Sequence, residues 1–290
     1  MKSFTHDGLT VAYRDTGDGP AIVMLHNGGT SSTIWSRQID ALADRHRAVA
    51  LDLPGFGASP RPEVPATLAD MVELAAALIR DQNLAPALLV GNCMGTNIAA
   101  TLARTHPELV TGLLAVNPLT EASFSGGRIG VLHRMERLAA PTRVVRSLSR
   151  RIRLLRPVAV ATLRFQLGSK GVERGLHRDH DLLACQLRSD QLPALVDVLD
   201  DMSAYGRLDV EDAPAGTPTW IVWGEQNRVL SRHRAAHLEE ALHAERVEVL
   251  AGTGHLPMLE DPDVVTTLIE ELVDRTSTAP AAAGGPEVTP

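Results

Sequence analysis

The sequence contains little cysteine, few aromatic residues and no long apolar run. Its two cysteines, Cys93 and Cys185, are too few for a disulfide framework, and neither lies in a spacing typical of a zinc site. No apolar run approaches the roughly 20 residues of a membrane-spanning helix, and the first residues lack the apolar segment of a secretion signal. These absences predict a soluble, cytoplasmic protein that binds neither a membrane nor a metal ion.

Charge is distributed unevenly along the 290 residues, whose formal net charge is −7. Between Arg128 and Arg178, thirteen basic residues accompany only two acidic ones, which gives this segment a net charge of +11 and the rest of the chain −18. Such a block indicates a separate structural unit with its own partner surface. The alternative is a solvated basic face that balances an acidic core.

Two classes of ligand do not fit the composition. Aromatic residues make up 3% of the chain, and the basic segment contains neither interleaved aromatics nor a known nucleic-acid-binding module. The glycines at 17–19 and the loop at Gly55 lack the strand-to-helix context of a phosphate-binding loop. We therefore expect no nucleic acid partner and no cofactor.

Short apolar runs alternate with segments of helical periodicity over most of the chain. Continuous apolar runs indicate strands that are buried on both faces, so the alternation predicts an α/β fold with a mostly parallel central sheet flanked by helices. The expected strands are Ala21–His26, Ala48–Asp52, Ala87–Val90, Gly112–Val116, Thr219–Trp223 and Val247–Leu250. The expected helices are Ile34–Ala43, Leu68–Ile79, Ile98–Ala103, Arg234–Leu242 and Pro262–Val273.

The alternation breaks between the fourth and fifth of these strands. Residues 119–206 are rich in arginine, have helical periodicity and contain no convincing strand, which predicts a basic helical insertion. Residues 1–118 and 207–275 would then form one core around a single sheet. Residues 276–290, rich in Ala, Pro and Gly, are expected to form a disordered tail.

A sharp turn between a strand and a helix carries the chemistry. Residues 91–95 read Gly-Asn-Cys-Met-Gly, an arrangement in which small residues permit a strained turn that exposes the central side chain. With the motifs His26-Asn-Gly-Gly, Asp52-Leu-Pro-Gly-Phe-Gly, Trp223-Gly-Glu and Gly254-His, in this order, the chain resembles the α/β-hydrolase superfamily. The resemblance covers roughly residues 8 to 274 and implies an α/β-hydrolase fold whose helical insertion caps the site.

The resemblance also implies a role for individual residues. Cys93 would be the nucleophile, in a position that usually holds serine, and His255 would be the general base. The backbone N–H of Met94 and one from the loop of Asn27 and Gly28 would form the oxyanion hole. Cys185, in an apolar helix of the insertion, is expected to be a packing residue.

The third member of the triad departs from the family pattern. Family members usually have Asp in a W-G-x-x-D motif, and this chain has Asn227 there. A thiol has a pKa of about 8.5 that falls beside a histidine and a helix N-terminus, so a thiolate–imidazolium pair could form without a buried carboxylate. A neutral Asn227 would then only orient the ring, as in papain-like proteases. Glu121 is the alternative acid, because some members take theirs after the preceding strand.

Three functions are compatible with these residues. A Cys nucleophile exchanges one thioester for another of similar free energy, which favours acyl or aminoacyl transfer. In this respect the chain resembles the acyl-shuttling transferases and thioesterases of nonribosomal peptide and polyketide pathways. A basic cap would steer an acidic, phosphopantetheinylated carrier protein toward Cys93. The alternatives are a hydrolase of a small ester, lactone or thioester that uses the same residues, and a non-catalytic ligand-binding protein.

Overall fold

The computed structural model describes residues 1–130, 154–211 and 216–277. Its centre is an eight-stranded sheet in the order β1-β2-β4-β3-β5-β6-β7-β8. Strand β2 pairs antiparallel with both β1 and β4, and all other neighbouring strands pair parallel. The strands are β1 (Lys2–His6), β2 (Leu9–Thr16), β3 (Ala21–Leu25), β4 (Arg47–Leu51), β5 (Ala87–Asn92), β6 (Val110–Val116), β7 (Thr219–Gly224) and β8 (Arg246–Leu250).

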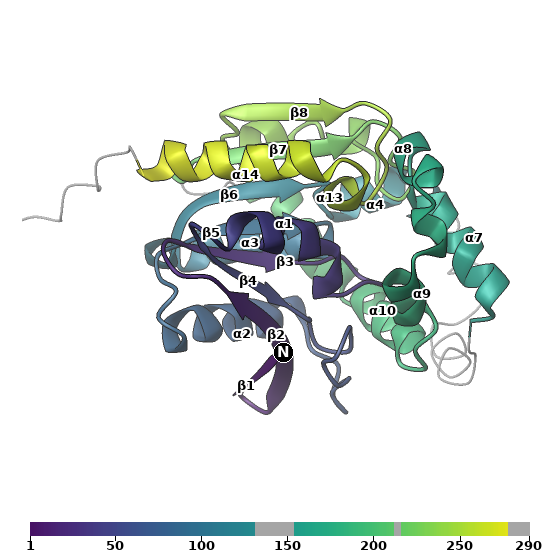
Figure 1. Ribbon diagram of the computed structural model, residues 1–290, viewed down its shortest axis with the longest axis horizontal. Coiled ribbons are helices and arrows are strands. Elements are labelled where there is room, and N and C mark those ends of the chain that lie inside the picture. Colours follow the sequence, from purple (N-terminus) through teal and green to yellow (C-terminus); the bar gives the residue numbers. More distant parts are fainter. Residues whose placement is uncertain (131–153, 212–215, 278–290) are drawn as a thin grey trace, which may run out of the picture.

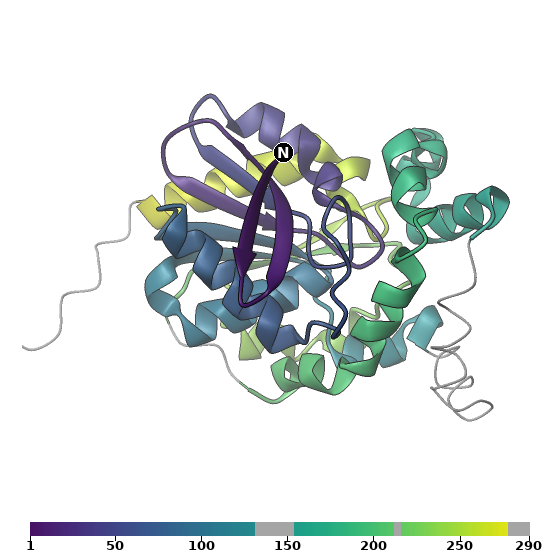
Figure 2. The ribbon, with the colours of Figure 1, turned by 90° about the horizontal axis from the view of Figure 1, so that it is seen from below.

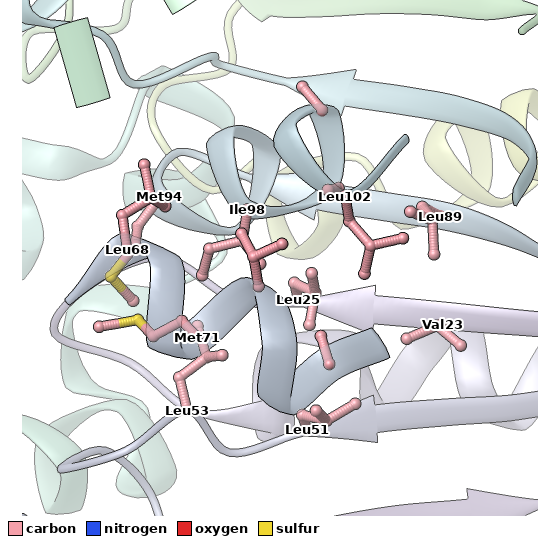
Figure 3. Close-up of a cluster of buried hydrophobic side chains, with 14 of the residues drawn as sticks. Val23, Leu25, Leu51, Leu53, Leu68, Met71, Leu89, Met94, Ile98 and Leu102 are labelled. Atoms are coloured by element: carbon pink, nitrogen blue, oxygen red, sulfur yellow. The ribbon is translucent and has the colours of Figure 1, made fainter. Parts of the chain in front are cut away.

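Helices cover both faces of the sheet. On one face lie α1 (Ser36–Leu42) and α14 (Pro262–Ser277), which contact each other, and on the other lie α2 (Leu68–Asp81) and α3 (Met94–Thr105). Alternate residues of each central strand enter opposite core clusters: Val23 packs toward α2 and α3, and Ile22 packs toward α1 and α14. Figure 3 shows the first of these clusters, in which Ile98 and Leu102 of α3 lie with Leu25 and Val23 of β3. A sheet buried on both faces explains the continuous apolar runs in the sequence.

The predicted α/β architecture is confirmed, and each expected strand and helix has a counterpart within a few residues. The predicted fourth helix is a 3-10 turn at His233–Ala235 followed by α12 (Leu238–Ala241). The antiparallel hairpin of β1 and β2 was not expected. Its strands lie at one end of the sheet and only three of their thirteen residues are buried, so they show no continuous apolar run.

The expected start of the tail at residue 276 is wrong. Thr276 and Ser277 belong to α14, and both hydroxyl groups donate to the carbonyl oxygen of Val273. Both residues therefore lie in the last turn of the helix and not in the tail. The rest of the predicted tail lies outside the described residues.

The described part of the segment between β6 and β7 is helical. It comprises α4 (Glu121–Gly126), α7 (Arg156–Gln166), α8 (Ser169–Glu173), α9 (His180–Gln186), α10 (Gln191–Asp200) and α11 (Met202–Tyr205), with 3-10 turns at Leu176–Arg178 and Gly206–Asp209. Figures 1 and 2 show α7 to α10 together at one end of the sheet, beyond the carboxyl ends of the parallel strands. We call residues 154–206 the cap. The part of the basic block from Arg134 to Arg153 lies outside the described residues.

Asp15 of β2 forms ion pairs with both neighbouring strands, β1 and β4. The Arg47 guanidinium of β4 donates to both carboxylate oxygens of Asp15 in β2 at 2.9 Å, and Lys2 of β1 donates to the same carboxylate at 2.7 Å. The Asp15 side chain is 4% exposed. The hydrogen bond from Arg47 is the main cause that lowers the pKa of Asp15 to about 2.

Asp15→Asn is therefore expected to destabilise the protein at pH 7 by about 2 kcal/mol, the free-energy equivalent of this pKa shift. Because the folded pKa lies below the unfolded one, this contribution is complete above about pH 4 and disappears as the pH falls through about 2. Denaturant unfolding of both proteins at pH 7 and pH 3 measures it. A difference that stays constant between these pH values would contradict the assignment.

Candidate active site

Cys93 lies in a strained turn between β5 and α3. Its backbone adopts φ 55° and ψ −111°, and its N–H donates to the carbonyl oxygen of Val116 at 2.9 Å. A Cβ atom at Gly95 would overlap the carbonyl group of Leu25, and one at Gly91 would overlap the backbone of Gly95 itself. The two glycines therefore permit a close approach of β5, α3 and β3, which presents Cys93 at the carboxyl end of the sheet.

Cys93 and His255 line the same cavity, which has a volume of about 240 Å³. The cap supplies about half of the lining, from Thr162 to Met202. None of the described lining side chains is charged. Most are apolar, namely Leu119, Phe124, Ile129, Leu192, Leu195, Val196, Val198, Leu199, Met202, Val229 and Leu230. The site is therefore a small, largely apolar pocket with a thiol and an imidazole in its wall.

The residues expected at the oxyanion hole have different surroundings. Met94 and Gly28 line the cavity, and the Met94 N–H hydrogen-bonds the Cys93 thiol. The Asn27 carboxamide instead shapes its own loop, because Nδ2 donates to Gly28 O at 2.9 Å and Oδ1 accepts from Thr30 at 2.8 Å. The oxyanion-stabilising roles stay predictions, to which Asn27 could contribute through its backbone.

Backbone hydrogen bonds hold the His255 loop, which lies between β8 and α13 (Pro257–Glu260). The His255 N–H donates to Gln166 O of the cap at 2.7 Å. The His255 carbonyl accepts from the carboxamides of Asn92 at 3.2 Å and Asn117 at 3.3 Å. Sequence analysis missed both asparagines, although each lies at the carboxyl end of an apolar strand, where the edge of a parallel sheet gathers functional groups.

Sequence analysis also missed Glu260, whose side chain is buried beside the His255 loop. Its Oε1 accepts from the N–H groups of Gly254 at 2.9 Å and Leu256 at 3.2 Å, and Oε2 accepts from Gly168 of the cap at 2.7 Å. Burial raises the pKa of Glu260, and the backbone donors oppose that shift. The available signal in the sequence was a glutamate that directly follows the apolar residues 256–259, where burial of its side chain could be expected.

Asn227 does not make the hydrogen bond expected with His255. Its Oδ1 accepts from the N–H groups of Val229 at 3.0 Å and Leu230 at 3.2 Å, which closes a local turn. Among the described residues, neither Asn227 Nδ2 nor His255 Nδ1 has a hydrogen-bond partner, although both atoms are buried. A histidine that accepts a proton at Nε2 carries hydrogen on Nδ1 and needs an acceptor there, whereas Asn227 has only its donor left. Its role as orienter stays a prediction.

The alternative acid, Glu121, is exposed at the first turn of α4 and is absent from the residues that line the cavity. Its carboxylate lies beside Gly206. Asp52, to which we assigned no chemistry, accepts from Ser32 N at 2.6 Å and Ala58 N at 2.7 Å. Cys185 is buried and its thiol donates to Ser31 Oγ at 3.3 Å, a packing environment.

Burial keeps Cys93 and His255 uncharged in the free protein. It raises the pKa of the Cys93 thiol to about 12, opposed in part by the Met94 N–H, and it lowers the pKa of His255 to about 3. Both shifts oppose the expected thiolate–imidazolium pair, which stays a prediction. An apolar cavity disfavours both charged forms, and no described carboxylate contacts the ring to compensate.

Titration can check this resting state. Because its pKa is lowered to about 3, the His255 imidazole should stay neutral from pH 8 down to at least pH 4.5 in NMR spectra. Thiol absorbance from Cys93, compared with Cys93→Ala, should likewise show no thiolate below about pH 9. Titration of His255 near pH 7 would contradict the uncharged pair.

The described residues contain no group of three or more His, Cys, Asp or Glu side chains that could hold a metal ion. Within the same residues, no helix combines the length and apolar character that crossing a membrane requires.

Comparison with curated proteins gives relatives that include enzymes. The acetyltransferase component of the acetoin cleaving system (dihydrolipoyllysine-residue acetyltransferase) of Cupriavidus necator is 29% identical over 272 residues, which cover 91% of this chain and 67% of that protein. The pimeloyl-[acyl-carrier protein] methyl ester esterase of Aeromonas hydrophila is 27% identical over 272 residues, which cover 91% of this chain and 100% of the esterase.

Solved structures share the fold at lower identity. An esterase from Thermogutta terrifontis superposes with a TM-score of 0.76 at 21% identity, covering 95% of this chain and 97% of the esterase. An enol-lactonase from Burkholderia xenovorans gives a TM-score of 0.75 at 18% identity, covering 94% of this chain and 100% of the lactonase. A family model for the alpha/beta hydrolase fold matches residues 20–262. The chain therefore belongs to the alpha/beta hydrolase family, with its strained turn at Cys93 and its histidine loop beyond β8.

Proposed function

We propose that this protein transfers a small, uncharged acyl group from a carrier-protein thioester through a covalent thioester on Cys93. His255 takes the thiol proton as Cys93 attacks, and the Met94 and Gly28 N–H groups stabilise the oxyanion. The observation that carries this proposal is the shared apolar cavity of Cys93 and His255, with no carboxylate among its described lining residues. A neutral thiol and a neutral imidazole react by proton transfer in concert with attack.

The missing carboxylate favours a thioester substrate. Expulsion of an alkoxide or an amine needs a strong general acid, and a carboxylate normally stabilises the imidazolium that serves as one. A thiol with a pKa of about 8.5 leaves far more readily and needs little protonation. The acyl enzyme is again a thioester, so a second thiol can remove the acyl group at little change in free energy.

The cavity limits the acyl group. Its volume of about 240 Å³ equals about eight water molecules at roughly 30 Å³ each, which leaves room for a short chain or a small ring. A charged acyl group would lose its hydration without gaining an ionic partner among the described lining residues. We therefore expect an uncharged, mostly apolar acyl group.

Two observations support a carrier-bound donor. The names of two relatives describe an acetyltransferase component and an esterase of an acyl-carrier-protein ester. The described cap also presents Arg156, Arg164 and Arg178 without an ion pair among the described residues. The cap as a whole contains six basic and seven acidic residues, so any attraction of an acidic carrier protein would come locally from these arginines.

Hydrolysis is the second candidate, favoured by the relatives and neighbours that are named esterases, hydrolases or lactonases. The same Cys93 and His255 would act, and water would be the acceptor in place of a second thiol. The two candidates share the acyl enzyme and differ only in what removes the acyl group.

Intact-mass measurement of the acyl enzyme tests both candidates. The protein is incubated with acetyl, butyryl and hexanoyl thioesters, each offered on cysteamine and on a phosphopantetheinylated carrier protein. We expect an adduct of one acyl group on Cys93, which a second carrier thiol removes faster than water does. Cys93→Ala should abolish the adduct, and His255→Ala should slow its formation by roughly 10² to 10⁴, the usual range for a lost general base.

Cys185→Ala serves as the matched control, because it removes the other buried thiol and should leave the adduct unchanged. Release mainly as free acid would support the hydrolase. Acylation from a carrier that does not slow between 50 and 300 mM salt would remove the argument for electrostatic steering. No adduct from any thioester would reject both candidates.

Cys93→Ser and Asn227→Asp together test the chemistry of the missing carboxylate. Cys93→Ser alone should lose at least about 10³ in acylation rate, because an unsupported imidazole is a weak base for a hydroxyl group. Asn227→Asp can keep the turn to Val229 and Leu230 through Oδ1 while Oδ2 replaces the unpartnered Nδ2 donor. The double variant should therefore recover at least tenfold over Cys93→Ser and raise the pKa of His255.

Asn227→Ala in the Cys93→Ser background is the control, since it removes the turn and adds no acceptor. Equal activity of Cys93→Ser and the natural protein would show that some other group already supports His255. A double variant no faster than Cys93→Ser would mean that position 227 does not reach the ring.

A further inference from the structure

Glu260 connects three parts of the molecule that meet beside the cavity. It lies at the end of α13, five residues after His255, and its carboxylate is directed back into the His255 loop. Its Oε1 accepts from Gly254 and Leu256, the residues on either side of His255. A single oxygen atom thus fixes the peptide groups before and after the imidazole.

The second carboxylate oxygen faces the cap. Oε2 accepts from Gly168 N at 2.7 Å, and the N–H of Gly171 also hydrogen-bonds the carboxylate. A Cβ atom at Gly171 would approach Oε2 to 2.7 Å, so only glycine permits this close packing. The carboxylate therefore bridges the His255 loop and the start of α8.

Other hydrogen bonds join the same two segments. His255 N donates to Gln166 O at 2.7 Å, and Lys170 N donates to Gly252 O at 3.1 Å. Arg174 donates to the Glu260 carbonyl at 3.2 Å, on the side away from the carboxylate. This end of the cap is thus continuous with the His255 loop, and Glu260 is the buried side chain at the centre of the joint.

We infer that Glu260 is a positioning residue that makes the placement of the His255 imidazole depend on the cap. The expected effect on acylation rests on the proposed function, whereas the expected effects on the His255 loop rest on geometry alone. In the described residues, His255 Nδ1 has no partner, so nothing bonded to the ring itself fixes its orientation. The backbone contacts made by Glu260, with those of Gln166, Asn92 and Asn117, replace that support. Loosening the cap at Gly168 would thereby free the imidazole to move within the cavity that it shares with Cys93.

Glu260→Gln tests this inference with a change of little volume. The amide has one acceptor oxygen, and its NH₂ group would face backbone N–H donors, so one side of the bridge is lost. Asp261→Asn is the matched control: it makes the same chemical change at the next residue and removes the ion pair with Lys170 at the surface of the same joint. Thermal melting establishes that both variants are folded.

Three measurements then separate positioning from general stability. Glu260→Gln should speed amide exchange of Gly254 and Leu256 at least tenfold, and should move the pKa of His255 up toward its ordinary value as water reaches the ring. Acylation at saturating thioester should slow by about 10², the size of effect that a 1 Å misplacement causes, with little change in KM. Asp261→Asn should keep amide exchange and acylation rates within about threefold of the natural protein and leave the His255 titration unchanged.

Acylation and a His255 titration that match the natural protein in Glu260→Gln would overturn the inference. If this variant does not fold, amide exchange of the natural protein decides: Gly168 and Gly254 should open at one common rate because they share the carboxylate. Independent rates would reject the joint. If the natural protein forms no acyl adduct, the proposed function fails, whereas amide exchange and the titration still decide the role of Glu260.

Discussion

The burial of Cys93 and His255 in one apolar cavity limits the chemistry of this protein more than any other feature. Dehydration opposes the thiolate and the imidazolium alike, and the described residues around the pair include no carboxylate that would stabilise the imidazolium. Both pKa shifts oppose a charge-separated resting pair of the papain kind. In the proposed acyl transfer, proton transfer would therefore accompany bond formation, which would favour acyl groups whose carbonyl is already reactive and whose leaving group departs without strong acid assistance.

The way in which His255 is held follows from this constraint. A triad carboxylate both orients the ring and stabilises its charge, and here the orienting task falls to groups that bind the peptide backbone instead. Asn92 and Asn117 hold the carbonyl, Gln166 holds the N–H, and Glu260 holds the neighbouring peptides. Neutral amides fit this environment because they satisfy buried backbone groups without adding a net charge. Glu260 is the exception, and its several N–H donors offset part of its burial.

The sequence predicted the parallel sheet and its order of motifs because strands buried on both faces leave continuous apolar runs. The resemblance to the α/β-hydrolase superfamily also implied that Cys93 and His255 share a site, and both line the same cavity. The sequence could not predict the partners of Asn227, because an asparagine that closes a turn and one that orients a histidine look alike without coordinates. The contacts of Glu260 connect residues 92 positions apart, at Gly168, and no local pattern records such a pairing. The raised pKa of Cys93 was also missed, because the cap residues that dry the cavity come from distant helices.

The same dryness has opposite effects on the two halves of an acyl transfer. It slows the first half, because Cys93 must lose its proton in a medium that disfavours the thiolate. It protects the second half, because the acyl enzyme is a reactive thioester that water would hydrolyse if the cap admitted it. The proposed transferase would need water kept from the acyl enzyme until a second thiol arrives, whereas the alternative hydrolase would need to admit it. The cap lines the cavity and is hydrogen-bonded to the histidine loop through Glu260 and Gln166, and this arrangement supports the proposal of transfer.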